Sequence, residues 1–244
     1  MENTFRIITP VYNAEKWIGK CIQSVKDQTH TNFTQVIVDD CSSDETVEVA
    51  KNAIDNDPRF ILVERKEKTG TMHGHIIAAE YKYCEDDIFV HLDGDDWFSS
   101  GGVLHRLNKI YQDDNIWCTY GNYETTDKTP SICKPIEDPT IPIRAYLVMG
   151  WIFSQVRSFR GRLWKGIDEE DFRSNDGSYL AVADVAVFCP VLEMAGVERV
   201  KFVPEVQMIY NRNTPLNDDK VNRDLVINHA VQIARKQPKS VWKN

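Results

Sequence analysis

The sequence lacks the features that mark membrane, fibrous and exported proteins. Its longest apolar stretch, residues 145–153, is too short to span a bilayer and is interrupted by Gly150. No basic segment followed by an apolar core stands at the N-terminus, and no internal repeat is visible. We therefore expect a globular protein without a membrane span, located in the cytoplasm.

Paired cysteine motifs and an excess of positive charge are also missing. None of the 6 cysteines shares a CxxC spacing or has a histidine at zinc-finger distance, so we expect free thiols in a reducing compartment. The 29 lysines and arginines are outnumbered by 37 acidic residues, which gives a net charge of −8. Nucleic acid is a disfavoured partner, since phosphate binding depends on Lys and Arg. An acidic chain suits a site that handles phosphate through a divalent cation.

The first half of the chain alternates apolar strands with amphipathic helices. Strands are expected at residues 5–9, 33–38, 60–63 and 88–92. Helices are expected at residues 14–28, from residue 43 or 44 onward, and at 72–83. This alternation predicts an α/β fold with a mostly parallel sheet and helices on both faces.

The second half is less regular. Residues 125–142 indicate a long loop, and residues 180–195 a helix that Pro190 should kink or interrupt. Strands are expected on both sides of Pro204, and a helical tail from residue 224. The basic run at 157–165 is expected to pair with carboxylates, with contact to an acceptor as the alternative. We expect a single domain over 1–244, with a nucleotide-side half at about 1–124, an acceptor-side half at about 125–222 and a tail at 223–244.

Three carboxylates within four residues form the strongest local motif, at Asp93, Asp95 and Asp96. An apolar strand leads into them and an aromatic pair follows, which disfavours a merely solvated acidic turn. Carboxylates this close repel one another, and a divalent cation relieves the repulsion. Hard oxygen ligands suit Mg²⁺ or Mn²⁺. Gly94, between them, allows a close backbone approach.

Two further polar segments follow the ends of expected strands. Residues 39–46 offer Asp40 as an acceptor for the N–H of a uracil ring, or else form only a helix-capping turn. Residues 9–13 offer Tyr12 for stacking on a base, or else form a strand-end turn with a half-buried Tyr. Since ligands of such sheets bind beyond the carboxyl ends of the strands, we expect the three segments to converge on one crevice.

In this order and spacing, the three segments resemble the inverting GT-A glycosyltransferases of family 2. The resemblance covers residues 5–125 well and later segments more loosely. It implies one Rossmann-like GT-A domain that binds a nucleoside diphosphate sugar, often UDP-linked, together with Mn²⁺ or Mg²⁺. By position, it implies metal contacts from Asp95 and Asp93. It implies nucleotide or donor contacts from Thr9, Pro10, Tyr12, Asp40, Asp93 and, later in the chain, Arg212.

The resemblance gives roles to two residues of the second half. The family's catalytic base stands early in a helix, and Asp184 occupies that place, with Ala183 where a Glu is usual. A lone charge in an apolar helix is costly to bury, unless it faces water or pairs with an arginine. Arg212 resembles the arginine that holds the diphosphate by a bidentate fork, with a surface arginine as the alternative.

These observations predict a metal-dependent enzyme that transfers a sugar from a nucleoside diphosphate sugar, UDP-linked by preference, to an acceptor hydroxyl on a glycan, with inversion. One alternative is a nucleotidyltransferase or metal phosphoesterase. Another is a non-catalytic module that binds nucleotide sugars. The departures from the family pattern at Ala183, Cys41 and residues 70–75 keep that last alternative open.

Overall fold

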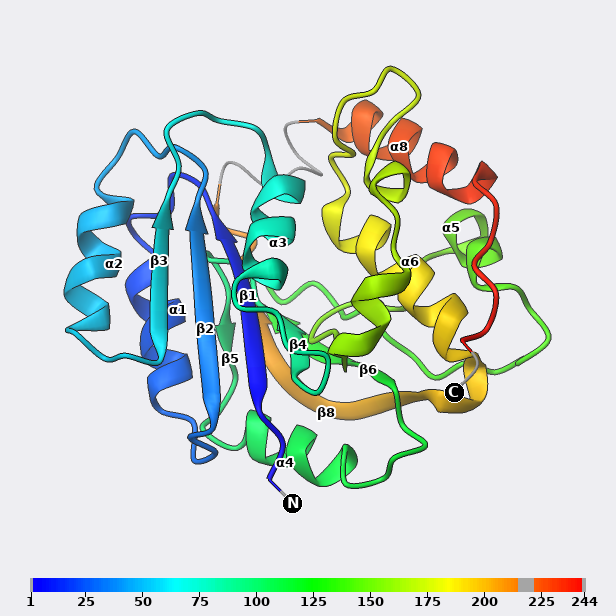
Figure 1. Cartoon of the computed structure of the whole chain (residues 1–244), viewed down its shortest axis with the longest axis horizontal. Helices are drawn as coiled ribbons and strands as arrows, with labels where there is room; N and C mark the ends of the chain where they lie inside the picture. Colours follow the sequence, from blue (N-terminus) through cyan, green and yellow to red (C-terminus); the bar gives the residue numbers. More distant parts are fainter. Residues whose placement is uncertain (1, 215–221, 243–244) are drawn as a thin grey trace.

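The fold is built on one mixed β-sheet (Figure 1). The computed structural model describes residues 2–214 and 222–242. Within them the sheet has 8 strands in the order β3-β2-β1-β4-β7-β6-β8-β5. The strands are β1 (Phe5–Val11), β2 (Phe33–Asp39), β3 (Phe60–Glu64), β4 (Ile88–His91), β5 (Trp97–Phe98), β6 (Cys118–Thr125), β7 (Ser158–Arg160) and β8 (Val200–Tyr210).

Helices lie on both faces of the sheet, as predicted. The α-helices are α1 (Ile18–Lys26), α2 (Thr46–Ile54), α3 (Thr71–Glu80), α4 (Val103–Ile110), α5 (Tyr146–Met149), α6 (Ala183–Ala195) and α8 (Arg223–Arg235). Short 3₁₀ helices are η1 (Ile143–Ala145), η2 (Gly161–Gly166), η3 (Glu169–Phe172) and η4 (Val197–Arg199). The longest helices, α6 and α8, have 13 residues each. A helix needs about 20 residues to span a bilayer, so no described helix could cross a membrane.

The first four strands in the order form the parallel half of the sheet. β1 pairs in parallel with β2 and β4, and β2 pairs in parallel with β3. β1 is buried along its whole length, because its alternate side chains enter different cores. Ile7 belongs to the core that includes buried residues of α1, α2 and α4, and Ile8 belongs to the core that includes those of α3 and α6. Burial on both faces explains why both faces of this strand carry apolar residues.

The other half of the sheet is mixed. β7 runs antiparallel between β4 and β6, β8 is parallel to β6, and β5 is antiparallel to β8. The two strands expected around Pro204 form one strand, with a pairing irregularity opposite Gly121 and Asn122. Pro190 lies inside α6, and the helix continues past it. Most of that helix is buried in the core, and this packing outweighs the intrinsic effect of proline.

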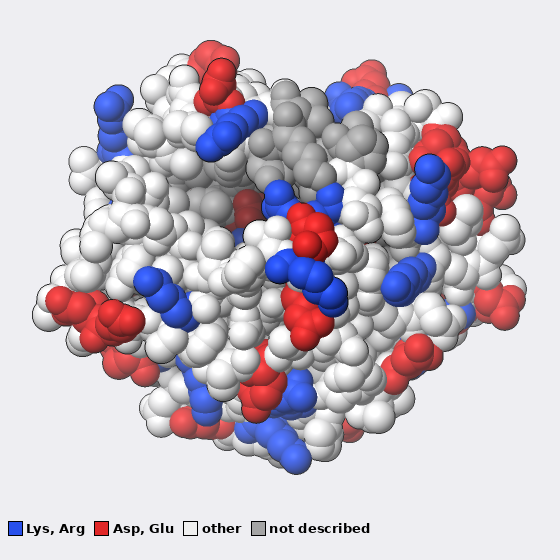
Figure 2. Space-filling model, turned by 180° about the vertical axis from the view of Figure 1, so that it is seen from behind, with Lys and Arg blue, Asp and Glu red and all other residues white. Residues whose placement is uncertain are grey.

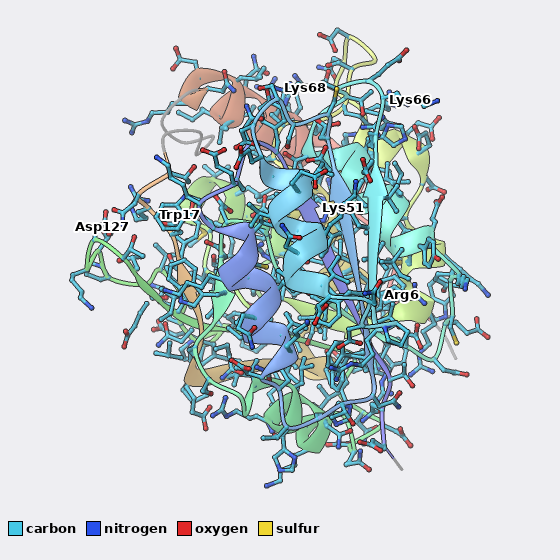
Figure 3. All side chains as sticks on the ribbon, turned by 90° about the vertical axis from the view of Figure 1, so that its left-hand side faces the viewer. Arg6, Trp17, Lys51, Lys66, Lys68 and Asp127 are labelled. Carbon is cyan, nitrogen blue, oxygen red and sulfur yellow. The ribbon has the colours of Figure 1, made fainter. Side chains whose placement is uncertain are left out.

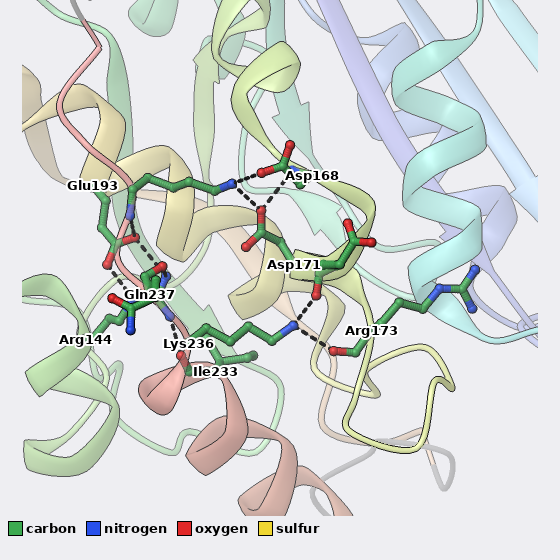
Figure 4. A network of polar contacts seen from close by, with 10 residues as sticks. Arg144, Asp168, Asp171, Arg173, Glu193, Ile233, Lys236 and Gln237 are labelled. Carbon is green, nitrogen blue, oxygen red and sulfur yellow. Dashed lines mark hydrogen bonds and ion pairs between the residues drawn. The ribbon is translucent and has the colours of Figure 1, made fainter.

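The C-terminal segment is tied to the domain by buried and half-buried charges (Figure 4). The Arg144 guanidinium donates to Glu193 at 2.6 and 3.0 Å and to the carbonyls of Ile233 and Gln237. The Lys239 ammonium contacts the carboxylates of Asp168 at 2.5 Å and Asp171 at 2.7 Å. These bonds join η1, α6, η3 and the end of α8, so the tail belongs to the same domain.

The Arg144–Glu193 pair yields a stability prediction. Its side chains are 8% and 7% exposed. Removing one partner of such a pair leaves a buried charge, so we expect Glu193→Leu to lower the free energy of unfolding by about 3–5 kcal/mol. Urea unfolding measures this change. The matched control is Glu85→Leu, because Glu85 and its partner Lys165 are 54% and 55% exposed and should affect stability little. Equal losses in both variants would contradict the assignment.

Two histidines are packed together beneath the carboxyl end of β4. The rings of His75, on α3, and His91, on β4, have centroids 4.9 Å apart. Both side chains are fully buried, and burial lowers the pKa of His91 well below its ordinary value and that of His75 to about 4. The folded protein therefore holds both rings neutral at ordinary pH.

Burial of His75 predicts an acid-sensitive component of stability. Between its ordinary pKa of 6.5 and about 4, the unfolded chain binds a proton at His75 that the folded chain does not. The stabilisation is complete above pH 6.5 and is lost as the pH falls to about 4. We expect His75→Leu to reduce the acid-induced loss of unfolding free energy by up to about 3 kcal/mol, measured by urea unfolding across this range. His105→Leu, at an exposed site on α4, is the control. Identical pH profiles for wild type and His75→Leu would refute this.

Candidate active site

The predicted convergence of the polar segments occurs at the end of β1. The backbone N–H of Asp40 donates to the carbonyl of Val11 at 2.9 Å, and the N–H of Gly94 donates to the carbonyl of Pro10 at 3.1 Å. Adjacent residues of β1 thus hold the starts of the two acidic segments. The structure brings the Asp40 and Asp93–Asp96 segments together at one edge of the sheet.

Gly94 allows the acidic turn to lie directly on β1. A Cβ atom at this position would stand 2.6 Å from side-chain carbons of Val11 and 3.3 Å from the Pro10 carbonyl oxygen. No side chain fits such a distance, so the turn needs glycine for close approach. The glycine predicted from the motif therefore has a definite steric reason.

The acidic turn concentrates negative charge in a partly buried place. Asp96 is fully buried and accepts a hydrogen bond from the Asn211 backbone N–H at 2.7 Å. Burial, together with the charges of Asp95 and Asp93, raises its pKa well above the ordinary value. Asp93 and Asp95 are half-buried, and the Gln155 amide lies 3.5 Å from an Asp93 oxygen. A cation would relieve this crowding of negative charge.

The donor atoms of the turn fit a hard divalent cation bound jointly with a ligand. Asp93 and Asp95 offer carboxylate oxygens, which Mg²⁺ and Mn²⁺ prefer. Among the described residues, no group of three His, Cys, Asp or Glu side chains is arranged to hold a metal alone. Sites for these ions often combine one or two carboxylates with phosphate oxygens of the substrate. The arrangement fits a metal that binds together with a diphosphate.

Asp40 is held in a fixed orientation by the loop before α3. One carboxylate oxygen accepts hydrogen bonds from Arg65 at 2.6 Å and from the Thr69 N–H at 2.9 Å. The other accepts the Gly70 N–H at 2.7 Å. The side chain is only 7% exposed. The Arg65 guanidinium therefore serves the proposed base-binding carboxylate.

The residues of β1 and its turn differ in how they face the site. Thr9 is fully buried, and its hydroxyl accepts a hydrogen bond from the Gln35 amide at 2.9 Å. Its side chain therefore serves the sheet, and only its backbone can position a ligand. Tyr12 is half-buried, and the Lys68 ammonium lies 3.5 Å from its ring centroid. Lys66 and Lys68 lie above the carboxyl ends of the strands, whereas Arg6 lies toward the other end (Figure 3).

Asp184 lies in the first turn of α6 and pairs with an arginine. The Nη2 atom of Arg157 donates to its Oδ2 atom at 2.6 Å, and the Asp184 side chain is 36% exposed. Both alternatives considered for this Asp, solvent contact and an arginine partner, are therefore found together. Of the basic run at 157–165, Arg160 and Lys165 also contact carboxylates, those of Asp114 at 3.6 Å and Glu85 at 2.6 Å.

Arg212 follows the end of β8, next to the acidic turn. Its neighbour Asn211 binds Asp96, and its guanidinium contacts Asp127 at 2.9 Å with 25% of the side chain exposed. The Arg212 N–H also donates to the Thr126 hydroxyl at 3.0 Å. The chain that follows, residues 215–221, lies outside the described residues, as does part of the expected acceptor-side half.

Seen from the side opposite to Figure 1, the molecular surface has a recess with an acidic side chain on its floor (Figure 2).

Two contacts near the acidic turn and α6 were not predicted from the sequence: that of Gln155 with Asp93 and that of Arg157 with Asp184. Both residues precede β7, which has only 3 residues, and such a short element gives no periodic signal. Gln155 is marked in the sequence only by its polarity, and Arg157 only as the first residue of the basic run at 157–165.

Comparison with known proteins identifies the family to which this chain is similar. Residues 6–165 match the model of glycosyl transferase family 2. Chondroitin synthase of Escherichia coli is 26% identical over 186 residues, which is 75% of this chain and 27% of that enzyme. The chain spans less than half the length of the curated relatives it matches first.

Solved structures share the fold. TarS residues 1–349 of S. aureus in complex with UDP-GlcNAc has a TM-score of 0.67 and 18% identity, covering 86% of this chain and 59% of that one. Glucosyl-3-phosphoglycerate synthase of Mycobacterium tuberculosis, with Mn²⁺, UDP-glucose and phosphoglyceric acid, has a TM-score of 0.63 and 15% identity, covering 95% and 80%. The family model matches residues 6–165, which include most strands of the sheet and the acidic turn. This chain therefore belongs to glycosyltransferase family 2.

Proposed function

We propose that this domain transfers a sugar from a UDP-sugar to an acceptor hydroxyl, with a divalent metal and with inversion at the anomeric carbon. The observation that carries the proposal is the meeting of Asp40 and the acidic turn on adjacent carbonyls of β1. The UDP-sugars bound to TarS and to the mycobacterial synthase, and the Mn²⁺ in the latter, support this choice of donor and metal.

Asp40 has the geometry to recognise a uracil ring. Its Oδ2 atom accepts the Gly70 N–H, and a carboxylate oxygen has a second lone pair that can accept an imide N–H. The bonds from Arg65 and the loop hold the carboxylate still, which reduces the entropy lost on binding. Tyr12 would stack on the ring after Lys68 moves, and Pro10 and Thr9 would fix the backbone beside it.

The leaving diphosphate would lie between the acidic turn and Arg212. Asp95 and Asp93 would hold the metal ion, which supplies Lewis-acid stabilisation of the negative charge on the departing phosphate when bound. Arg212 can turn from Asp127 toward a phosphate, because planar guanidinium groups bind phosphate oxygens in pairs. The Lys66 and Lys68 ammonium groups add positive charge at this end of the molecule.

Asp184 is the proposed general base. Its partly exposed carboxylate would take the proton of the acceptor hydroxyl while the hydroxyl oxygen forms a bond to the anomeric carbon. The bond from that carbon to the diphosphate breaks, and its electron pair leaves with the nucleoside diphosphate. Attack opposite the leaving group inverts the configuration. We propose that residues 125–222 face the acceptor, a glycan, and that residues 1–124 bind the donor.

The metal proposal predicts a binding change. We expect UDP to stabilise the wild type only with Mn²⁺ or Mg²⁺ present, by about 2–3 kcal/mol at a hundredfold excess over Kd. Asp95→Ala should abolish this stabilisation, because it removes a metal ligand. Thermal unfolding with and without EDTA measures it. Asp86→Ala, an exposed acid before β4, is the control. Equal UDP shifts with EDTA, or in Asp95→Ala, would refute the metal role.

The base proposal predicts a kinetic change. Asp184→Asn should lower transfer by about 10²–10⁴-fold with donor binding unchanged. Because asparagine keeps an oxygen for Arg157 but loses the charge, thermal unfolding must accompany the assay. Release of UDP coupled to a glycosylated product supports transfer, whereas release of UMP or inorganic phosphate would support the phosphoesterase alternative. Near-normal transfer by Asp184→Asn would place the base elsewhere.

A further inference from the structure

Arg157 is a buried arginine that contacts the proposed base, Asp184. Its side chain is 2% exposed, its Nε atom donates to the Phe153 carbonyl at 3.0 Å, and its Nη2 atom donates to Asp184 at 2.6 Å. Its own carbonyl accepts the backbone N–H of His91 at 3.0 Å. Arg157 is therefore fixed to the sheet by its backbone, and its guanidinium is held between the Phe153 carbonyl and Asp184.

Other buried arginines of the described chain differ from Arg157 in their bonding. Arg6 donates to both Asp87 and two main-chain carbonyls, and Arg144 donates to Glu193 and two more carbonyls. Each of these uses all three nitrogens. The Nη1 atom of Arg157 is buried and has no hydrogen-bond partner among the described residues. Of these three guanidinium groups, only that of Arg157 leaves a nitrogen without a hydrogen bond to a described residue.

This difference indicates a role other than stability. An arginine buried for stability alone would use all of its donors, because an unpartnered buried polar group lowers stability. An arginine that served only to fill this space would be a poor choice. What Arg157 provides and an apolar side chain does not is a charged hydrogen bond that fixes one oxygen of Asp184.

The same segment also contacts the metal side of the site. Gln155, two residues earlier, is 6% exposed, and its amide lies 3.5 Å from Asp93. Strand β7, which follows at once, pairs antiparallel with β4, the strand that leads into Asp93. One short segment therefore touches both the acid proposed to hold the metal and the acid proposed as base.

We infer that Arg157 is a positioning residue: it fixes the carboxylate of Asp184 relative to the Asp93 turn, with one oxygen bound and the other directed to the acceptor hydroxyl. This inference rests on the proposed function. A rigid base keeps the reacting atoms in line, and a misplacement of about 1 Å can cost about 10²-fold in rate. Arg157 itself does not touch the substrates.

The test compares Arg157→Met, which keeps length but cannot donate, with Arg157→Lys, which keeps one charged donor. We expect Arg157→Met to lower kcat by about 10- to 100-fold while the donor KM stays within about twofold. Arg157→Lys should recover part of the loss. The melting temperature of Arg157→Met should change little, because the Asp184 carboxylate that loses its partner is 36% exposed and can be hydrated.

Arg160→Met is the matched control. Arg160 lies three residues further along, is 13% exposed, and donates to main-chain carbonyls near the opposite end of β7. Its loss should lower stability and leave kcat per folded molecule unchanged. The double variant Arg157→Met/Asp184→Asn should have the kcat of Asp184→Asn alone, since both changes remove one function.

The outcomes separate this inference from the proposed function. Normal kcat in Arg157→Met, with inactive Asp184→Asn, overturns the positioning role and leaves the base in place. A raised donor KM and a lowered melting temperature, without recovery in Arg157→Lys, show a structural role and also overturn it. Full activity of Asp184→Asn removes the base proposal first, and the positioning role with it.

Discussion

The site depends on two hydrogen bonds at the end of β1. The carbonyls of Pro10 and Val11 accept the N–H groups of Gly94 and Asp40, and so fix two acidic segments to adjacent residues of one strand. Because β1 is central and buried on both faces, this end of the sheet cannot shift without disturbing both cores. The absence of a Cβ atom at Gly94 allows the contact. The acids are therefore held close together despite their mutual repulsion.

The second half of the chain completes the site through an antiparallel strand. β7 enters the sheet beside β4, and the residues before it reach both Asp93 and Asp184. The long strand β8 then ends at Asn211, which binds Asp96. Three elements far apart in sequence thus meet around one acidic turn. Their order in the sheet, more than any local motif, brings the proposed base and the proposed donor site together.

The sequence was informative where the physics is local. Continuous apolar runs predicted the four parallel strands, and the rule that ligands bind beyond strand ends predicted their meeting point. The resemblance placed Asp184 at the start of α6, where it is found. The partners of the acids were not predictable, because Arg65 and Arg157 reach them through loop and strand pairing over 25 and 27 residues. Pro190 and Pro204 misled for a similar reason, since tertiary packing overrides their local preference.

The buried polar groups described in this protein differ in how many of their hydrogen-bonding atoms have partners. The guanidinium groups of Arg6 and Arg144 are saturated by carboxylates and carbonyls, as stable packing requires. Atoms of Asp96 and, near the acidic turn, of Gln155 and Arg157 are buried without a hydrogen-bond partner among the described residues, as is the Nε atom of Arg162 elsewhere in the domain. Such unpartnered groups lower the stability of the folded protein, so selection for stability alone would favour apolar residues in their place. Those near the acidic turn support the proposal that this end of the sheet serves binding and chemistry, which neutral apolar packing could not perform.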